Sequence, residues 1–212
     1  VWLLLMQCGT QGLSNESPCS ASKPAADKQR PQGLLRRTMH MPLAWILTGV
    51  MGLQSTLIYT AAAWMPSYWR AQGMSFEMTG IWIFVFLFSG LPASVMTAKF
   101  FKVCPNDRTA GAVLSLLYVL GLAGWLAGAA QGAMLSAAFL LMASHTKGSQ
   151  AMLAVSTLSQ GIGYLAAGAG PFIFGRLLQA TGGWTAPFVF FTAVILLWGL
   201  CVRLADTHQT ID

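Results

Sequence analysis

Charged side chains are scarce in this sequence of 212 residues. Asp, Glu, Lys and Arg make up 8% of the chain, whereas soluble domains carry about 25%. Hydrophobic residues account for 55%, and neither Asp nor Glu occurs between Asp107 and Asp206. A soluble helix needs a polar face toward water, and these long uncharged stretches have none. The composition therefore excludes an ordinary soluble domain.

The sequence also lacks the motifs of soluble enzymes and metal sites. It contains no G-x-S-x-G, no H-E-x-x-H and no P-loop. The four cysteines are far apart and form no C-x-x-C pair: Cys8, Cys19, Cys104 and Cys201. The three histidines lie at or beyond the ends of apolar segments, where we expect them to be solvated: His40, His145 and His208. Neither a catalytic residue, a cofactor nor a metal site is predicted.

One glycine-rich stretch imitates a nucleotide-binding loop. Residues 159–175 contain Gly161-x-Gly163-x-x-Ala166, which matches the dinucleotide fingerprint. That fingerprint requires a preceding strand and an acidic residue about 20 positions later, and no such acidic residue follows. As a helix, the uncharged run 148–175 would exceed the ~30 Å of a bilayer's hydrocarbon core. The glycines are therefore predicted to let membrane helices pack closely. Together with Pro171, they also favour a helix that flexes around a substrate.

Uncharged runs predict an all-α, polytopic membrane protein with six transmembrane helices in a lipid bilayer. The expected spans are 42–65, 78–98, 109–128, 132–146, 150–175 and 184–204. The turn between the third and fourth is placed at 128–133, and the fourth is the shortest. Without the fourth span, the number would be five and every later orientation would reverse.

Basic residues fall mainly on one side of these six spans. One side would carry ten: Lys23, Lys28, Arg30, Arg36, Arg37, Lys99, Lys102, Arg108, Lys147 and Arg203. The other would carry Arg70 and Arg176. By the positive-inside rule, both ends are predicted to be cytoplasmic in a multi-pass protein of the cell's inner membrane. The net charge of +6 is therefore explained by basic residues in the loops on one side of the membrane, and no nucleic-acid partner is predicted. Seven tryptophans are expected at the membrane interfaces: Trp45, Trp64, Trp69, Trp82, Trp125, Trp184 and Trp198.

The chain divides into four expected parts. Residues 1–8 read as the end of a preceding transmembrane helix, since the chain begins at Val1 within an apolar run. Residues 9–41 are polar and charged, which predicts a flexible cytoplasmic linker. Residues 42–206 form the six-helix bundle, and 207–212 a cytoplasmic tail. This organisation predicts a fragment of a longer protein.

Uncharged polar residues recur within two of the spans. Ser156, Gln160 and Tyr164 are spaced to share one helix face. The first span carries Gln54, Ser55, Tyr59 and Thr60. An amide in hydrocarbon must find a partner, because leaving it unpaired costs several kcal/mol. Two roles remain open, hydrogen bonding between helices and lining of a substrate cavity. Amides and phenols suit a small polar solute or anion.

At these residues the sequence resembles a known family. Residues 52–75, GLQSTLIYTAAAWMPSYWRAQGMS, resemble the seventh helix of cyanate-transporter-like members of the major facilitator superfamily. Residues 156–188 resemble the eleventh helix, its outer loop and the start of the twelfth. The resemblance implies twelve helices in two halves that work by alternating access. This chain would be the C-terminal half, and its missing partner the N-terminal six-helix half.

The resemblance also implies roles for particular residues. The substrate-binding residues would be Gln54, Tyr59, Gln160 and Tyr164. Asp107 and Arg108 stand where the superfamily has a gating loop, although the leading glycine of that loop's motif is absent. Lys147 stands near the position where members often carry an Arg at the end of the tenth helix.

Three functions follow as hypotheses. The first is half of a secondary transporter that moves a small polar solute or anion, cyanate-like, across the inner membrane. The second is a truncated or half-size six-span protein without transport activity of its own, such as a regulatory or assembly subunit. The third, a membrane enzyme, is disfavoured because no acid, base or metal cluster lies in the spans. The sequence indicates neither the substrate's identity nor a coupling ion.

Overall fold

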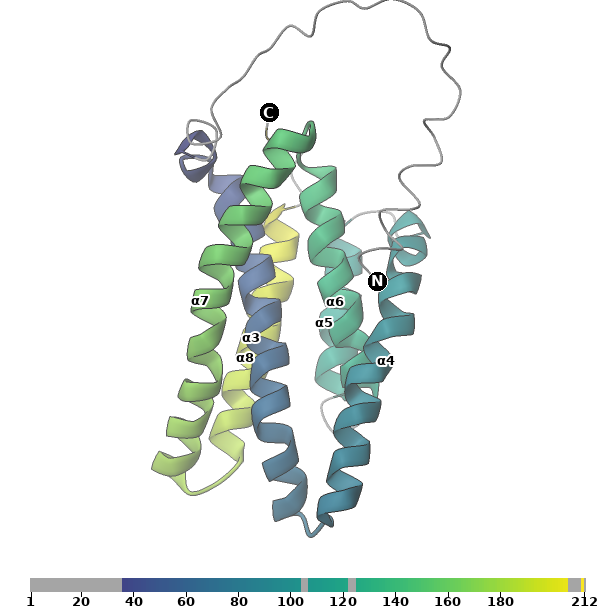
Figure 1. Ribbon diagram of the computed structural model, residues 1–212, viewed down its shortest axis with the longest axis vertical. Coiled ribbons are helices and arrows are strands. Elements are labelled where there is room, and N and C mark those ends of the chain that lie inside the picture. The colour runs from purple at the N-terminus through teal and green to yellow at the C-terminus, as the bar shows by residue number, and fades with distance from the viewer. Residues whose placement is uncertain (1–35, 104–106, 122–124, 206–210, 212) are drawn as a thin grey trace, which may run out of the picture.

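The computed structural model describes residues 36–103, 107–121, 125–205 and 211. This part of the chain holds six long helices, which run up and down the molecule (Figure 1). They are α3 (Pro42–Ala71), α4 (Phe76–Val103), α5 (Asp107–Gly121), α6 (Trp125–Ser144), α7 (Ser149–Thr181) and α8 (Thr185–Ala205). A short helical segment at 36–39 precedes them. The prediction of an all-α, polytopic membrane bundle is confirmed. The expected linker and preceding helix fall largely on residues 1–35, outside the described residues.

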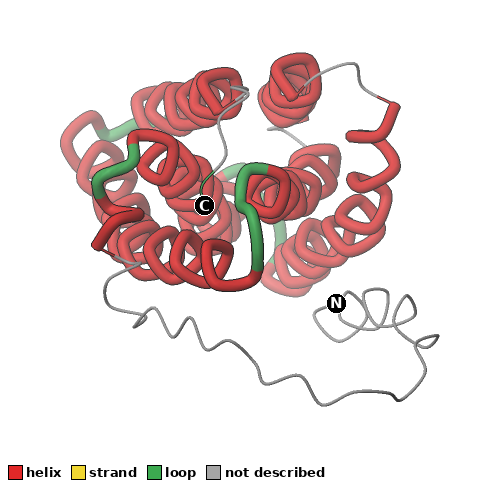
Figure 2. Tube along the Cα trace, turned by 90° about the horizontal axis from the view of Figure 1, so that it is seen from above, coloured by secondary structure: helices red, strands yellow, loops and turns green. Residues whose placement is uncertain are grey.

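The helices form a row of four backed by a pair. Helix α3 contacts α7 on one side and α6 on the other, and α6 in turn contacts α4. Helix α8 packs behind α3, α5 packs behind α6, and the two contact each other (Figures 1 and 2). The side of the row that faces away from α5 and α8 is covered by none of the described residues. We call this side the open face.

Glycines bring two pairs of parallel helices into backbone contact. A Cβ atom added at Gly163 of α7 would lie 3.2 Å from the Gly52 Cα of α3. Between α4 and α6 the fit is tighter, because a Cβ at Gly132 would overlap the Gly90 carbonyl oxygen. The predicted packing role of the glycines is thus confirmed at Gly163. Gly161 and Gly168 border open space instead.

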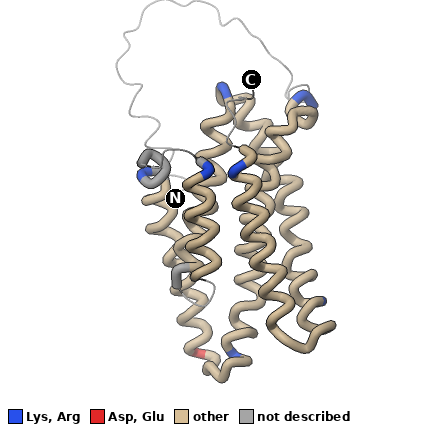
Figure 3. Tube along the Cα trace, turned by 180° about the vertical axis from the view of Figure 1, so that it is seen from behind, with Lys and Arg blue, Asp and Glu red and all other residues tan. Residues whose placement is uncertain are grey.

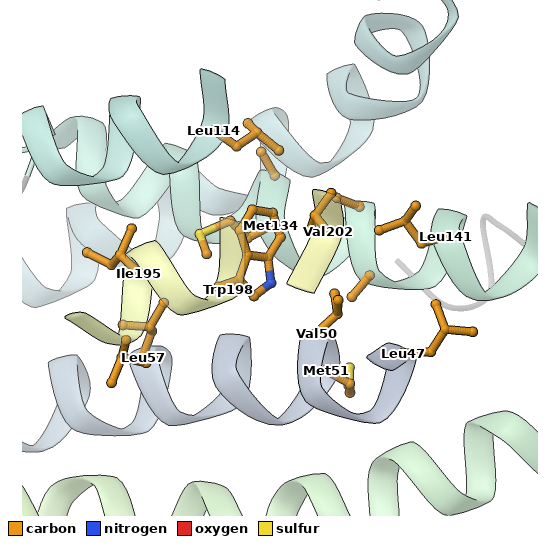
Figure 4. Close-up of a cluster of buried hydrophobic side chains, with 14 of the residues drawn as sticks. Leu47, Val50, Met51, Leu57, Leu114, Met134, Leu141, Ile195, Trp198 and Val202 are labelled. Atoms are coloured by element: carbon orange, nitrogen blue, oxygen red, sulfur yellow. The ribbon is translucent and has the colours of Figure 1, made fainter. Parts of the chain in front are cut away.

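The apolar core lies where the front row meets α5 and α8. Trp198 of α8 is fully buried there, among side chains that include Val50, Leu114 and Met134 (Figure 4). The expectation that Trp198 lies at a membrane interface is therefore wrong. Its position near the end of an apolar run suggested an interface, but the indole faces inward onto neighbouring helices.

Two predicted boundaries are wrong. The expected turn at 128–133 lies inside α6, which begins at Trp125. The six-residue stretch is rich in glycine because it packs against α4 and not because the chain turns there. The fourth span was expected to be the shortest, but the shortest of the six long helices is α5, with 15 residues. The other five are long and apolar enough to cross a membrane.

Two helices continue past the ends that the sequence suggested. Helix α3 reaches Ala71, and α7 reaches Thr181. The predicted spans stopped near the first charged residue, at 65 and 175. A helix can continue beyond the hydrocarbon, where arginines such as Arg70 and Arg176 reach water through their long side chains.

Basic residues gather at the two ends of the bundle, and the middle of the described chain carries neither Lys nor Arg (Figure 3). The end at which α3 begins holds seven of the described ones: Arg36, Arg37, Lys99, Lys102, Arg108, Lys147 and Arg203. The opposite end holds Arg70, Arg176 and the acidic Glu77. The described charges thus follow the predicted distribution along the bundle. Which end faces the cytoplasm stays a prediction.

The C-terminal end of the chain pairs with the α6–α7 connection. The backbone N–H of Ile211 donates to the carbonyl of His145 at 2.8 Å, and the N–H of Lys147 donates to the carbonyl of Ile211 at 2.8 Å. Ile211 is fully buried. His145 is buried as well, and its Nδ1 donates to the Leu141 carbonyl at 2.9 Å. The expectation of a solvated His145 is therefore wrong.

Single cysteines at the two ends test the orientation. Both positions are exposed, Gln72 after α3 and Gln150 at the start of α7. Gly73 is unsuitable because its φ of 90° would strain a cysteine. In intact cells, Gln72→Cys should react with a membrane-impermeant maleimide, whereas Gln150→Cys should react only after permeabilisation. The background replaces the native cysteines by serine: Cys8, Cys19, Cys104 and Cys201. The reverse labelling pattern would overturn the predicted orientation.

Candidate functional site

The contact between α3 and α7 sets which of their polar residues meet. The Oγ1 of Thr48 lies 3.2 Å from the Oγ of Ser159, within hydrogen-bond distance. One turn further along both helices, Gly52 faces Gly163. Because the two helices run in parallel at this close approach, residues further along each helix also come together.

Tyr59 and Tyr164 form an aromatic pair across this contact. Their ring centroids lie 6.3 Å apart and their planes meet at 72°, an edge-to-face arrangement. Tyr59 is 47% exposed and Tyr164 is 42% exposed. Helix α3 has neighbours on both sides and α8 behind it, so its exposed Tyr59 points to the open face. The structure thus brings together two of the predicted substrate-binding residues.

Gln160 lies one helical turn before Tyr164 and is half-buried. Its Nε2 donates a hydrogen bond of 2.8 Å to the Oγ of Ser156. Within the described residues, its Oε1 makes no hydrogen bond. The spacing of Ser156, Gln160 and Tyr164 therefore places a row of polar side chains along one stripe of α7.

Gln54 lies elsewhere. It is 2% exposed, and its Oε1 accepts a hydrogen bond of 3.3 Å from the Oγ of Ser55. Five residues separate it from Tyr59, which turns it to another side of α3. There its backbone carbonyl accepts a hydrogen bond of 3.1 Å from the Nε2 of Gln131 on α6. The structure therefore does not group Gln54 with the tyrosine pair.

Sequence reasoning missed Gln131. This residue is 3% exposed in the interior of α6, but the sequence interpretation placed it in a turn. The available signal was the long uncharged run 109–146, which contains Gln131. If the turn in this run lies at another position, Gln131 is inside a helix, and its buried amide must pair with a neighbouring helix.

The predicted gating residues lie at the end of the bundle that carries seven of the described basic residues. Asp107 is the first residue of α5, and Arg108, the second, is exposed. Lys147 is exposed in the α6–α7 connection. These positions are at helix ends, whereas Gln54 and Tyr59 lie within α3. The gating role of Asp107 and Arg108 stays a prediction.

The middle of the bundle offers hydrogen bonds and aromatic surface. Among the described residues, no three His, Cys, Asp or Glu side chains lie together as a metal site would require. A small, partly open cavity of about 10 Å³ lies between α3, α7 and α8. Such a volume holds at most one water molecule. A solute of several atoms therefore does not fit into this cavity.

Comparison with known proteins finds transporters. The chain is 32% identical over 171 residues to a Bacillus subtilis (strain 168) protein named uncharacterized transporter YycB, an alignment that covers 74% of this chain and 42% of that protein. It is 23% identical over 175 residues to the 2-nitroimidazole transporter of Escherichia coli (strain K12), covering 76% of this chain and 44% of that protein. The chain thus spans less than half the length of these curated relatives. No family model and no solved structure matches it.

Proposed function

We propose that this chain forms half of a secondary transporter, which carries a small polar solute across a membrane by alternating access. The solute would bind between the open face and a second six-helix half. The observation that carries this proposal is the exposed pair of Tyr59 and Tyr164, with Gln160 beside it. These polar but uncharged side chains lie on α3 and α7, away from the charged residues at the ends of the bundle. The relatives named as transporters support it, and both are more than twice as long as the part that this chain matches.

The chemistry of the pair favours a flat or aromatic solute. Tyrosine rings bind other rings edge to face or offset, and their hydroxyls bond polar substituents. One relative is named as a transporter of 2-nitroimidazole, a flat ring with polar groups at its rim. We take this compound as the first test substrate. Cyanate, suggested by the family resemblance, is the second, and assignment to the major facilitator superfamily stays part of the proposal.

The location follows from the same proposal. Both termini of the chain would be cytoplasmic in a protein of the inner membrane, Asp107 and Arg108 would belong to a gating loop, and the protein would not be an enzyme. The alternative of a half-size subunit without transport is favoured by one observation. The bundle packs a continuous core of its own, centred on Trp198. Six further spans encoded before Val1 would favour the transporter, whereas a start codon close to Val1 would favour the half-size protein.

Substitutions on the α7 stripe test the site. In the full-length transporter, Gln160→Ala and Tyr164→Phe should each weaken uptake of radiolabelled solute, with near-normal amounts of protein in the membrane. Losing a hydrogen bond whose partner is left buried costs about 1–3 kcal/mol, which corresponds to a roughly 5- to 150-fold loss of affinity.

Ser156→Ala is the matched control for Gln160. It removes the hydrogen bond within α7 and keeps the amide. If Gln160 only stabilises its helix, both variants should melt early and transport normally. That result would contradict the assignment of Gln160 to the substrate path.

A further inference from the structure

Gln131 carries a buried acceptor without a partner. It lies in α6, opposite Gln54 of α3. Its Nε2 donates to the Gln54 carbonyl, whereas its Oε1 is buried and has no hydrogen-bond partner among the residues that the structure describes. The Gln54 carbonyl can only accept, so the amide nitrogen must point toward it. This fixes the orientation of the amide and leaves the oxygen on the other side.

Such an acceptor is rare enough to require an explanation. Buried polar side-chain atoms are almost always paired, because an unpaired one weakens the fold. A leucine or methionine at this position would avoid that loss. Gln131 is also not alone, since the Gln54 amide and the Ser55 hydroxyl lie at the same level of α3, bonded to each other. A bonded pair of buried polar side chains on α3 thus lies at the level where Gln131 of α6 bonds the α3 backbone.

The amide lies just beneath the open face. Leu135, one helical turn later on the same side of α6, is 36% exposed. Gln54 is five residues from Tyr59, roughly 7 to 8 Å along the axis of α3 at the helical rise of 1.5 Å per residue. A small shift between α3 and α6 would therefore expose the Gln131 oxygen near the tyrosine pair. Alternating access moves one group of helices against another around the bound solute.

We propose that the Oε1 of Gln131 accepts a hydrogen bond from an N–H or O–H group of the transported solute, so that this residue selects solutes that carry a donor. The inference rests on the proposed transport function and narrows its substrate class. A solute with a ring N–H would satisfy the unpaired oxygen. An anion that offers only acceptors, such as cyanate, would face one more acceptor and no positive charge in the described middle of the bundle.

The test compares two forms of one solute in the full-length transporter. Radiolabelled 2-nitroimidazole has a ring N–H, and its N-methyl analogue does not. The unmodified protein should prefer the N–H compound. Gln131→Leu should lower uptake of that compound roughly 5- to 150-fold, the range for losing a bond to a buried group, and leave uptake of the N-methyl analogue unchanged. The melting temperature should stay the same or rise, because the unpaired oxygen is gone.

Two further variants make the result decisive. Gln131→Met preserves side-chain length and also lacks the acceptor, so it should behave like Gln131→Leu, whereas a loss seen with leucine alone would come from disturbed packing and would overturn the role of Gln131. Gln179→Leu makes the same replacement at an exposed position of α7 and should leave the preference intact. Equal losses for both solutes, or a preference that survives Gln131→Leu and Gln131→Met, would overturn the role of Gln131 while transport itself stands. A preference of the unmodified protein for cyanate would do the same. Absence of uptake of all three compounds by the unmodified protein would overturn the proposed function and this inference with it.

Discussion

Gly132→Leu is expected to abolish the folded protein. A side chain at this position would overlap the Gly90 carbonyl oxygen of α4, and a backbone atom cannot move aside as a side chain can. Separating α4 from α6 would remove the close contact that holds membrane helices together, since hydrophobicity does not drive their association in lipid. Overpacking a core costs typically 1–3 kcal/mol and occasionally more, while the total stability of a protein is only about 5–15 kcal/mol.

Fluorescence-detected size-exclusion chromatography in mild detergent measures this effect as monodisperse yield. Gly168→Leu is the matched control, because nothing lies within 4 Å of a Cβ at that position. Gly163→Leu should lower the yield to an intermediate level, since its Cβ would meet Gly52 backbone atoms at 3.2 Å. Equal yields for Gly132→Leu and Gly168→Leu would show that the contact between α4 and α6 does not hold the bundle together.

Residues 1–212 expressed alone are expected to show no uptake above vector background, a complete loss relative to a full-length transporter. The proposed site lies on the open face, where Tyr59 and Tyr164 remain exposed and no described residue covers them. Without a second half, the site cannot close toward either side of the membrane. Uptake of radiolabelled 2-nitroimidazole into cells measures the result.

Size analysis of the solubilised fragment is the control for this experiment. A folded monomer without uptake fits the proposal of a two-half transporter. Saturable uptake by a monomer would contradict it. Saturable uptake by a dimer would show instead that two copies of this bundle can build the cavity together.

The sequence predicted the class of fold because long uncharged runs have few physical solutions. In lipid every backbone group must be paired within the chain, so apolar stretches of this length form helices. The sequence gives a wrong helix boundary where one residue type has two structural roles. Glycine marks turns in soluble proteins but close contacts in membranes, so the glycines around Gly128 and Gly132 predict a turn where the structure has a helix contact. The extent of α7 beyond Gly175 was missed because composition marks the hydrocarbon limit and not the end of the helix.

The candidate site was predictable along each helix but not between helices. The spacing of Ser156, Gln160 and Tyr164 places them on one stripe of α7. The distance from Tyr59 to Tyr164 depends on which helices become neighbours, and that is decided by the contact of Gly52 with Gly163. Gln54 faces α6 for the same reason. Its partner, Gln131, could be recognised only after α6 had been placed correctly.

The close pairing of α3 with α7 has a consequence for how the protein is made. The partners Thr48 and Ser159 are 111 residues apart in the sequence, so α3 leaves the ribosome long before α7 exists. Until α7 has been synthesised, Gly52 contacts lipid or another helix in place of Gly163. Contacts between distant parts of a chain form slowly, because a long loop must close first. The bundle therefore cannot assemble hairpin by hairpin. Its most extensive interface has to form after nearly all of its helices have been inserted, and a ribosome that stalls before Ser149 would leave α3 waiting in the bilayer without its partner.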